Sequence, residues 1–306
     1  MPFDVVDDSN GFPRVLLSDP GGSSAEVLLY GGQVVSWKNE RGEELLFRST
    51  KALAKSPNAY RGGISVSISQ LGATGRVLQH GLVCQNLWSL DSSPLHLPSS
   101  GSQSSIDLIF QPVGKDLKTW PCSFELRLHV SLGPGRLKLI PSVRNTDNKS
   151  LSFTFGLRNY LSVSDISEVR IEGLETLDYL DLLLQKQRFT EQADAITFDR
   201  EVHRVYLSTP PKVAIIDHEK KRTFVLRKEG LPDTVLWNPW DKIPKAITDF
   251  GVEDYKIMML VDSAAFEKPI ELKPHQEWKC CQEIVAVSSS YCSGQLDPQM
   301  VLHGLS

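Results

Sequence analysis

Apolar residues recur at every second position along most of this chain, and that period restricts the folds it can adopt. Val, Ile, Leu and Phe alternate with polar residues in short runs such as 105–110, 124–130 and 136–140. Successive side chains of a β-strand point to opposite faces, so a period of two indicates strands with one buried face. Turn residues, such as the Gly-Pro-Gly at 133–135, separate the runs. The chain is therefore expected to consist mainly of β-strands joined by turns.

Helical periodicity is scarce by comparison. Residues 191–200 are too short and mixed to assign, and 177–185 fit either a strand end or a helical turn. Strands do not alternate with helical patterns, which disfavours a parallel α/β fold. Many strands in one long chain predict an all-β fold, a large sandwich of antiparallel sheets. No repeat or boundary divides the chain, so we expect a single domain over 1–306, with a core at about 20–287 and a polar tail at 288–306.

Composition narrows the classes of partner and compartment. The 306 residues are 41% hydrophobic, enough for a large core, and the net charge of −4 gives no polycation signature for nucleic acid. No run approaches the ~18 apolar residues of a membrane span, and the acidic first ten residues lack the order of a signal peptide. Five cysteines, an odd number without metal-ligand spacing, predict a reduced, cytoplasmic protein without bound metal.

One stretch, residues 60–88, carries a specific pattern. It reads Y-R-G-G-I-S-V-S-I-S-Q-L-G, and later Q-H-G-L-V-C-Q-N-L-W. It resembles the substrate loop of the glucose-6-phosphate 1-epimerases, a branch of the aldose 1-epimerase family. Further blocks agree in the same order, among them 162–166, 237–240 and 290–297, the last of which is similar to plant members. The resemblance implies the β-supersandwich of galactose mutarotases. It also implies a hexose or hexose 6-phosphate as substrate, without cofactor or metal.

Mutarotation opens the hexose ring and recloses it on the other face of C1, which needs a base and an acid on opposite sides of that carbon. The resemblance implies a Glu at one strand end as the base and a His on another strand as the acid. Residues 259–262 match the base strand, but Asp262 replaces the Glu, which sets the carboxylate back by roughly 1.5 Å. Residues 155–161 match the acid strand, but Arg158 replaces the His. Arginine stays protonated at any working pH and cannot cycle a proton.

The resemblance also implies a pocket that binds the sugar, formed by Arg61, Gln79, His80, Cys84, His203 and Trp237. Arg61 is expected to bind phosphate or a hydroxyl, because a guanidinium offers two parallel donors to an oxyanion. Cys84 stands where the family has an arginine, which predicts a weaker grip on phosphate. His80, inside Q-H-G, is expected to help hold the sugar.

Two pocket positions remain open to alternatives. His203 stands where the family has an Asp, and it is either a replacement acid or drift in a relaxed pocket. Trp237 either stacks on the sugar or packs in the core. In addition, Ser65 and Ser69 stand where the family favours proline, whose ring fixes φ. The loss of both predicts a more mobile loop over the pocket.

Three hypotheses follow. The chain is an active hexose-6-phosphate 1-epimerase with Asp262 as base, a binding protein for sugars or sugar phosphates that has lost most catalysis, or a protein that keeps only the sandwich. Departures at Cys84, Arg158, His203 and Asp262 fall on chemical positions, whereas scaffold blocks are retained. That distribution predicts epimerase chemistry with impaired catalysis. A monomer is expected.

Overall fold

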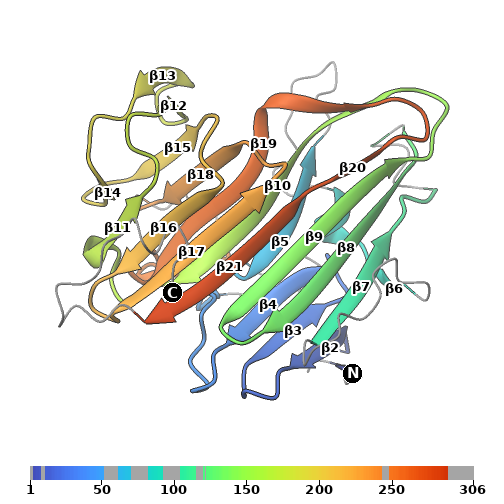
Figure 1. The fold of residues 1–306 in the computed structure, drawn as a ribbon, viewed down its shortest axis with the longest axis horizontal. Helices are drawn as coiled ribbons and strands as arrows, with labels where there is room; N and C mark the ends of the chain where they lie inside the picture. The colour runs from blue at the N-terminus through green and yellow to red at the C-terminus, as the bar shows by residue number, and fades with distance from the viewer. Residues whose placement is uncertain are drawn as a thin grey trace.

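A computed structural model describes residues 3–7, 11–51, 61–69, 82–91, 104–114, 120, 122–242 and 248–288. Two large antiparallel sheets lie one behind the other (Figure 1). This arrangement confirms the expected all-β sandwich. Helical structure in the described ranges is confined to three 3₁₀ turns, η1 (Leu82–Gln85), η2 (Ile166–Glu168) and η3 (Asp254–Ile257).

The first sheet has eleven strands within the described residues. Their spatial order is β1 (Phe3–Asp7), β2 (Pro13–Ser18), β3 (Ser24–Leu28), β4 (Gln33–Lys38), β5 (Ile64–Ser69), β10 (Leu151–Ser162), β19 (Met258–Leu272), β18 (Asp233–Asn238), β15 (Val202–Tyr206), β12 (Asp178–Asp181) and β13 (Gln187–Thr190). The ambiguous region 177–185 thus contains a strand. The expected loop containing Ser65 and Ser69 is wrong, because both lie in β5, which pairs with β4 and β10.

The second sheet has ten strands within the described residues. Nine follow the order β14 (Ile196–Thr197), β11 (Val169–Glu172), β16 (Lys212–Asp217), β17 (Arg222–Glu229), β21 (Cys281–Ser288), β9 (Arg136–Asn145), β8 (Phe124–Gly133), β7 (Ser104–Phe110) and β6 (Ser89–Leu90), and β20 (Glu277–Lys279) pairs with β9. β7 and the first half of β8 alternate strictly between buried and half-buried residues, as their sequences predict.

The main core lies between the sheets and is closed by large side chains. Trp37, Phe124, Phe153 and Phe224 are almost completely buried. Each fully buried side chain of this size contributes roughly 1.5–3 kcal/mol of burial free energy. Phe155 of β10 meets Trp278 of β20 with ring centroids 5.0 Å apart, so the odd-numbered residues of β10 face the second sheet. The even-numbered residues of β10 therefore point to the outer face of the first sheet.

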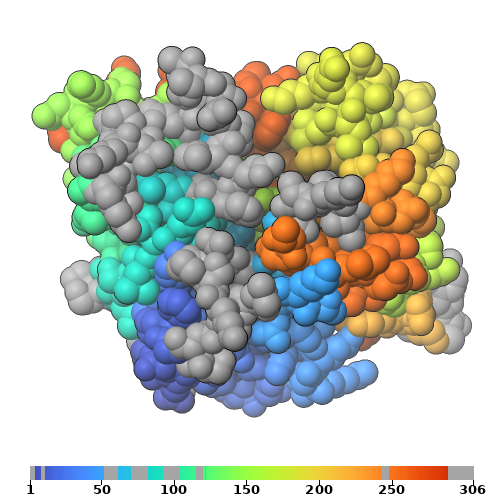
Figure 2. Space-filling view, turned by 180° about the vertical axis from the view of Figure 1, so that it is seen from behind, coloured from blue at the N-terminus to red at the C-terminus, as the bar shows by residue number. Residues whose placement is uncertain are grey.

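The outer face of the first sheet carries two smaller apolar clusters. One contains Phe47, Tyr160, Trp237, Phe250, Met258 and Leu260. The other contains Val205, Leu207, Val235 and Ala264. Figure 2 views the molecule from this side, where segment 248–257 (orange) borders the segment around residue 50 (blue). A hydrogen bond from Ser49 Oγ to Asp254 Oδ2, 2.6 Å long, joins these segments.

Candidate active site

The two central strands of the first sheet bring together the residues at the expected acid and base positions. β10 and β19 pair Leu157 with Ser263 and Tyr160 with Leu260, so the register places Arg158 opposite Asp262. Directly opposed residues of an antiparallel pair share a face, here the outer one. Arg158 Nε lies 3.6 Å from Asp262 Oδ2. The pair is thus an ion pair across two neighbouring strands.

Asp262 is held in a buried setting. The residue is 6% exposed, and its Oδ1 accepts a hydrogen bond from the backbone N–H of Asn159 at 3.2 Å. Burial raises the pKa of Asp262 to about 7, against the opposing effects of the Arg158 charge and this hydrogen bond. A carboxyl with a pKa near the working pH is suited to general base catalysis.

Arg158 keeps its charge in this setting. Its pKa is raised by Tyr160 first and also by Asp262 and Cys84, against the effect of burial. The guanidinium carbon lies 5.9 Å from the centroid of the Tyr160 ring, and the side chain is 31% exposed. Arg158 therefore offers a fixed positive charge and hydrogen-bond donors beside Asp262. It does not give up a proton at neutral pH, so it cannot act as a general acid.

His203 lies on the same outer face, two strands from β19. It pairs with Trp237 of β18, which pairs with Leu260 of β19. Strands are ~4.8 Å apart, so the β15 backbone is roughly 10 Å from that of β19. Burial first, and then the charge of Arg158, lower the pKa of His203 to about 4, against the opposing effect of Asp181. At neutral pH the imidazole is uncharged and is therefore a poor donor of a proton in general acid catalysis.

The side chain of Trp237 is packed against its neighbours and leaves little of its ring exposed. It is 7% exposed, and its ring meets Tyr160 edge-on at 6.5 Å and Phe250 at 6.0 Å between centroids. Of the two readings of Trp237, these contacts support packing, within the apolar cluster that borders Arg158 and Asp262. The ring of His203 lies 6.3 Å from the Trp237 ring.

Arg61 is directed to this region by two glycines. Gly62 and Gly63 have φ of 137° and 63°, and a Cβ on Gly63 would lie 2.1 Å from the carbonyl oxygen of Val34. Only glycine fits such a turn. Arg61 Nε donates to Asp249 Oδ1 at 2.8 Å, and Nη1 donates to the hydroxyl of Tyr160 at 3.4 Å.

Asp249 has no signal in the sequence, because only tertiary contact brings it to Arg61, 188 residues earlier. The charge of Arg61 is partly satisfied before any ligand binds. A phosphate ligand would therefore compete with Asp249 for the guanidinium.

Cys84 lies in η1, which packs against β5. Its thiol donates to the carbonyl oxygen of Val66 at 2.9 Å, and burial raises its pKa to about 11. It is a protonated, structural thiol. The remaining two predicted pocket residues, Gln79 and His80, lie outside the described residues.

Asn159, next to Arg158, points the other way, toward the second sheet. Its amide exchanges two hydrogen bonds with Gln282 of β21, at 3.0 and 2.7 Å, and also donates to the carbonyl oxygen of Val261 at 2.7 Å. Both amides are completely buried. This bridge fixes β10 and β19 relative to the second sheet, and with them the backbone N–H that contacts Asp262.

Within the ranges described, no group of three or more His, Cys, Asp or Glu is arranged to hold a metal ion. In the same part of the chain, no helix has the length and apolar character needed to cross a membrane.

Comparison with known proteins places the chain in a family. A family model described as aldose 1-epimerase matches residues 13–284. The chain belongs to the aldose 1-epimerase family. Within it, a protein of Cenchrus ciliaris provisionally named glucose-6-phosphate 1-epimerase is 55% identical over 308 residues, covering 99% of this chain and 94% of the relative.

Solved structures agree on the family fold. The crystal structure of a protein from Salmonella typhimurium, provisionally described as a mutarotase, covers 94% of this chain and 97% of its own, with a TM-score of 0.80 at 21% identity. A galactose mutarotase-like protein from Clostridium acetobutylicum covers 94% and 99%, with a TM-score of 0.73 at 14% identity. These likenesses confirm the expected galactose mutarotase-like architecture.

Proposed function

We propose that this protein interconverts the α and β anomers of a hexose 6-phosphate, with Asp262 as the base, at a reduced rate. Membership of the aldose 1-epimerase family and the name of the Cenchrus ciliaris relative support the reaction and the substrate class. One observation carries the role of Asp262. A buried carboxyl, with its pKa raised to about 7, projects from the central strand of the outer face beside a fixed cation.

The proposed reaction begins with proton transfer from the C1 hydroxyl to Asp262. The bond between C1 and the ring oxygen breaks, which leaves an aldehyde at C1 and negative charge on the ring oxygen. The guanidinium of Arg158 stabilises that charge by hydrogen bonding. Rotation about the C1–C2 bond presents the other face of the aldehyde. The ring oxygen adds back to C1, and Asp262 returns its proton to the new hydroxyl.

Arg158 is the reason for the reduced rate. It can stabilise the ring oxyanion but cannot protonate it, so the open-chain state retains a charge that an acid would remove. Loss of a general acid typically costs ~10²–10⁴ in rate. In the absence of substrate, the same guanidinium is engaged with the carboxylate of Asp262, which lowers the basicity of that carboxylate.

The ion pair also favours a second candidate, a sugar-phosphate binding protein without catalysis. Proton exchange spectroscopy on anomeric glucose 6-phosphate separates the two. Exchange between the anomers above the uncatalysed rate supports the epimerase, and its loss in Asp262→Asn with binding retained assigns the base. Line broadening without exchange supports the binding protein. If neither exchange nor line broadening is observed, both candidates are contradicted.

We further propose a monomeric, cytoplasmic protein that has no nucleic-acid or membrane partner. The net charge of −4 supports the absence of nucleic acid. Three free cysteines in the described residues, at 84, 280 and 281, fit a reducing compartment. Light scattering on the protein eluting from a size-exclusion column measures its molar mass and so tests the monomer. A molar mass twice that of the chain would contradict the monomer.

A further inference from the structure

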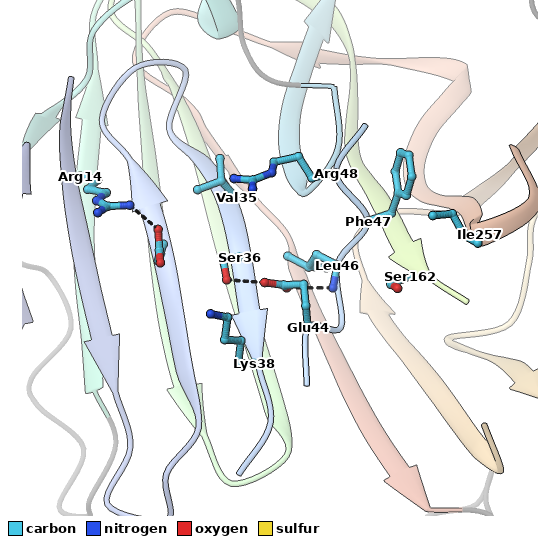
Figure 3. Close-up of a pocket in the computed structure, with 11 residues that line it drawn as sticks. Arg14, Val35, Ser36, Lys38, Glu44, Leu46, Phe47, Arg48, Ser162 and Ile257 are labelled. Carbon is cyan, nitrogen blue, oxygen red and sulfur yellow. Dashed lines mark hydrogen bonds and ion pairs between the residues drawn. The ribbon is translucent and has the colours of Figure 1, made fainter. Parts of the chain in front are cut away.

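A cavity of about 410 Å³ lies near one end of the outer face, away from Asp262. Its walls come from β2, β3 and β4 and from residues 44–48, which run between β4 and the end of β10 (Figure 3). The volume falls in the range of small-molecule sites. Three cations line it, Arg14, Lys38 and Arg48, against two carboxylates, Glu26 and Glu44.

The two carboxylates are already occupied. Glu26 accepts from Arg14 Nη1 at 2.7 Å. Glu44 accepts from Ser36 Oγ at 2.5 Å and from the backbone N–H groups of Trp37 and Leu46 at 2.9 and 3.1 Å. Three hydrogen bonds thus hold Glu44 in the wall, and none of these three partners is a cation.

The cations, by contrast, retain donors. Lys38 and Arg48 form no ion pair among the described residues, and Arg14 Nε is a buried donor without a hydrogen-bond partner. In Figure 3 the guanidinium of Arg48 points toward Val35, and Lys38 lies near Ser36 on β4, the strand that also carries Val35. Unmatched cationic donors around one cavity form a site for an oxyanion.

We propose that this cavity is a second ligand site, which binds a small phosphorylated metabolite separately from the proposed catalytic pair. Arg48 and Lys38 hold the phosphate. Ile257 of the wall, which is exposed, provides apolar surface for the rest of the ligand. Arg48 lies at the end of the segment that reaches Arg61, since Ser49 N–H donates to the Arg61 carbonyl oxygen at 3.0 Å. The cavity therefore lies on the same outer face as the proposed catalytic pair, but its walls do not include Asp262.

The test uses inorganic phosphate, which has no anomeric carbon, so its binding can be measured whether or not the protein is an epimerase. The position of the shifted backbone amides separates this cavity from Arg61. Phosphate is titrated into the full-length, isotope-labelled protein at constant ionic strength. Saturable shifts of the backbone amides of Val35, Ser36 and Arg48 are expected. The double variant Lys38→Gln with Arg48→Gln should weaken binding about 100-fold or more, since each of the two lost charged hydrogen bonds costs at least about tenfold.

Two controls make the result specific. Arg41→Gln with Lys51→Gln removes the same charge from exposed positions outside the cavity, and it should leave phosphate binding unchanged. Asp262→Asn should also leave it unchanged. No saturable shift, or equal weakening in the control double variant, would overturn the proposal. Thermal unfolding of each variant confirms that it is folded before titration.

Discussion

At the residue scale, ionisation of Asp262 as pH rises is expected to change activity and stability in opposite directions. Its pKa is about 7 in the folded protein, above its ordinary 3.8, because burial disfavours the charge. Between these two values the folded state holds a proton that the unfolded chain has released. The contribution of Asp262 to the free energy of unfolding is therefore fully present below a pH of about 3.8. It falls as the pH rises to about 7, and it no longer changes above that pH. In its proposed role as the base, by contrast, Asp262 would act only when it is ionised, above a pH of about 7.

Asp262→Asn tests both consequences. The amide can accept the Asn159 N–H bond but cannot ionise, so the variant should gain stability relative to the natural protein as pH rises from 5 to 8. Urea unfolding at the two pH values measures this. Anomer exchange should fall about 10²-fold or more. A stability difference that is the same at both pH values would contradict the raised pKa.

The acid and base positions are tested by changing both toward the family pattern. Arg158→His together with Asp262→Glu supplies an ionisable acid and moves the carboxylate forward by roughly 1.5 Å. The expected gain in anomer exchange is about 10²–10⁴, measured by magnetisation transfer on glucose 6-phosphate. His203→Gln is the matched control and should change the rate little, because that imidazole is neutral. An unchanged rate in the double variant would show that the acid and base are misassigned.

At the element scale, the central strands depend on one polar bridge through the core. Gln282→Met would leave the side-chain amide oxygen of Asn159 (Oδ1) buried without a partner, at a cost of about 1–3 kcal/mol. Chemical denaturation measures the loss. In a double-mutant cycle with Asn159→Leu, the two losses should be far from additive, because each side chain satisfies the other. Additive losses would mean that the bridge contributes nothing specific.

Elements also show where local patterns mislead. The loss of prolines at Ser65 and Ser69, on either side of Ser67, predicts a mobile loop. The same residues alternate with Ile64, Val66 and Ile68, which are almost completely buried, so the stretch is an ordinary strand with one buried face. Its pairing with β10 decides the matter, and β10 is some 90 residues further along the chain.

At the scale of the whole molecule, the chain passes repeatedly between the two sheets. β5 belongs to the first, β6 to β9 to the second, β10 to the first and β11 to the second. Neither sheet is made by one contiguous segment, so neither can form its buried face alone. We therefore expect the chain to unfold as a single cooperative unit, as a single domain would. Calorimetry should give equal calorimetric and van't Hoff enthalpies, and two resolved transitions would contradict this expectation.

The alternation of apolar and polar residues was enough to predict the strands and the antiparallel sandwich, because the two faces of a strand are set by local geometry. Retained motifs were enough to place the chain in its family and to pick out Arg158 and Asp262. Strand register and burial decide the remaining properties of the site. These are the position of Arg158 directly opposite Asp262, the ion pair of Arg61 with Asp249 and the raised pKa of Asp262. Those properties arise from contacts between residues tens to nearly two hundred positions apart, so they follow only from the tertiary structure.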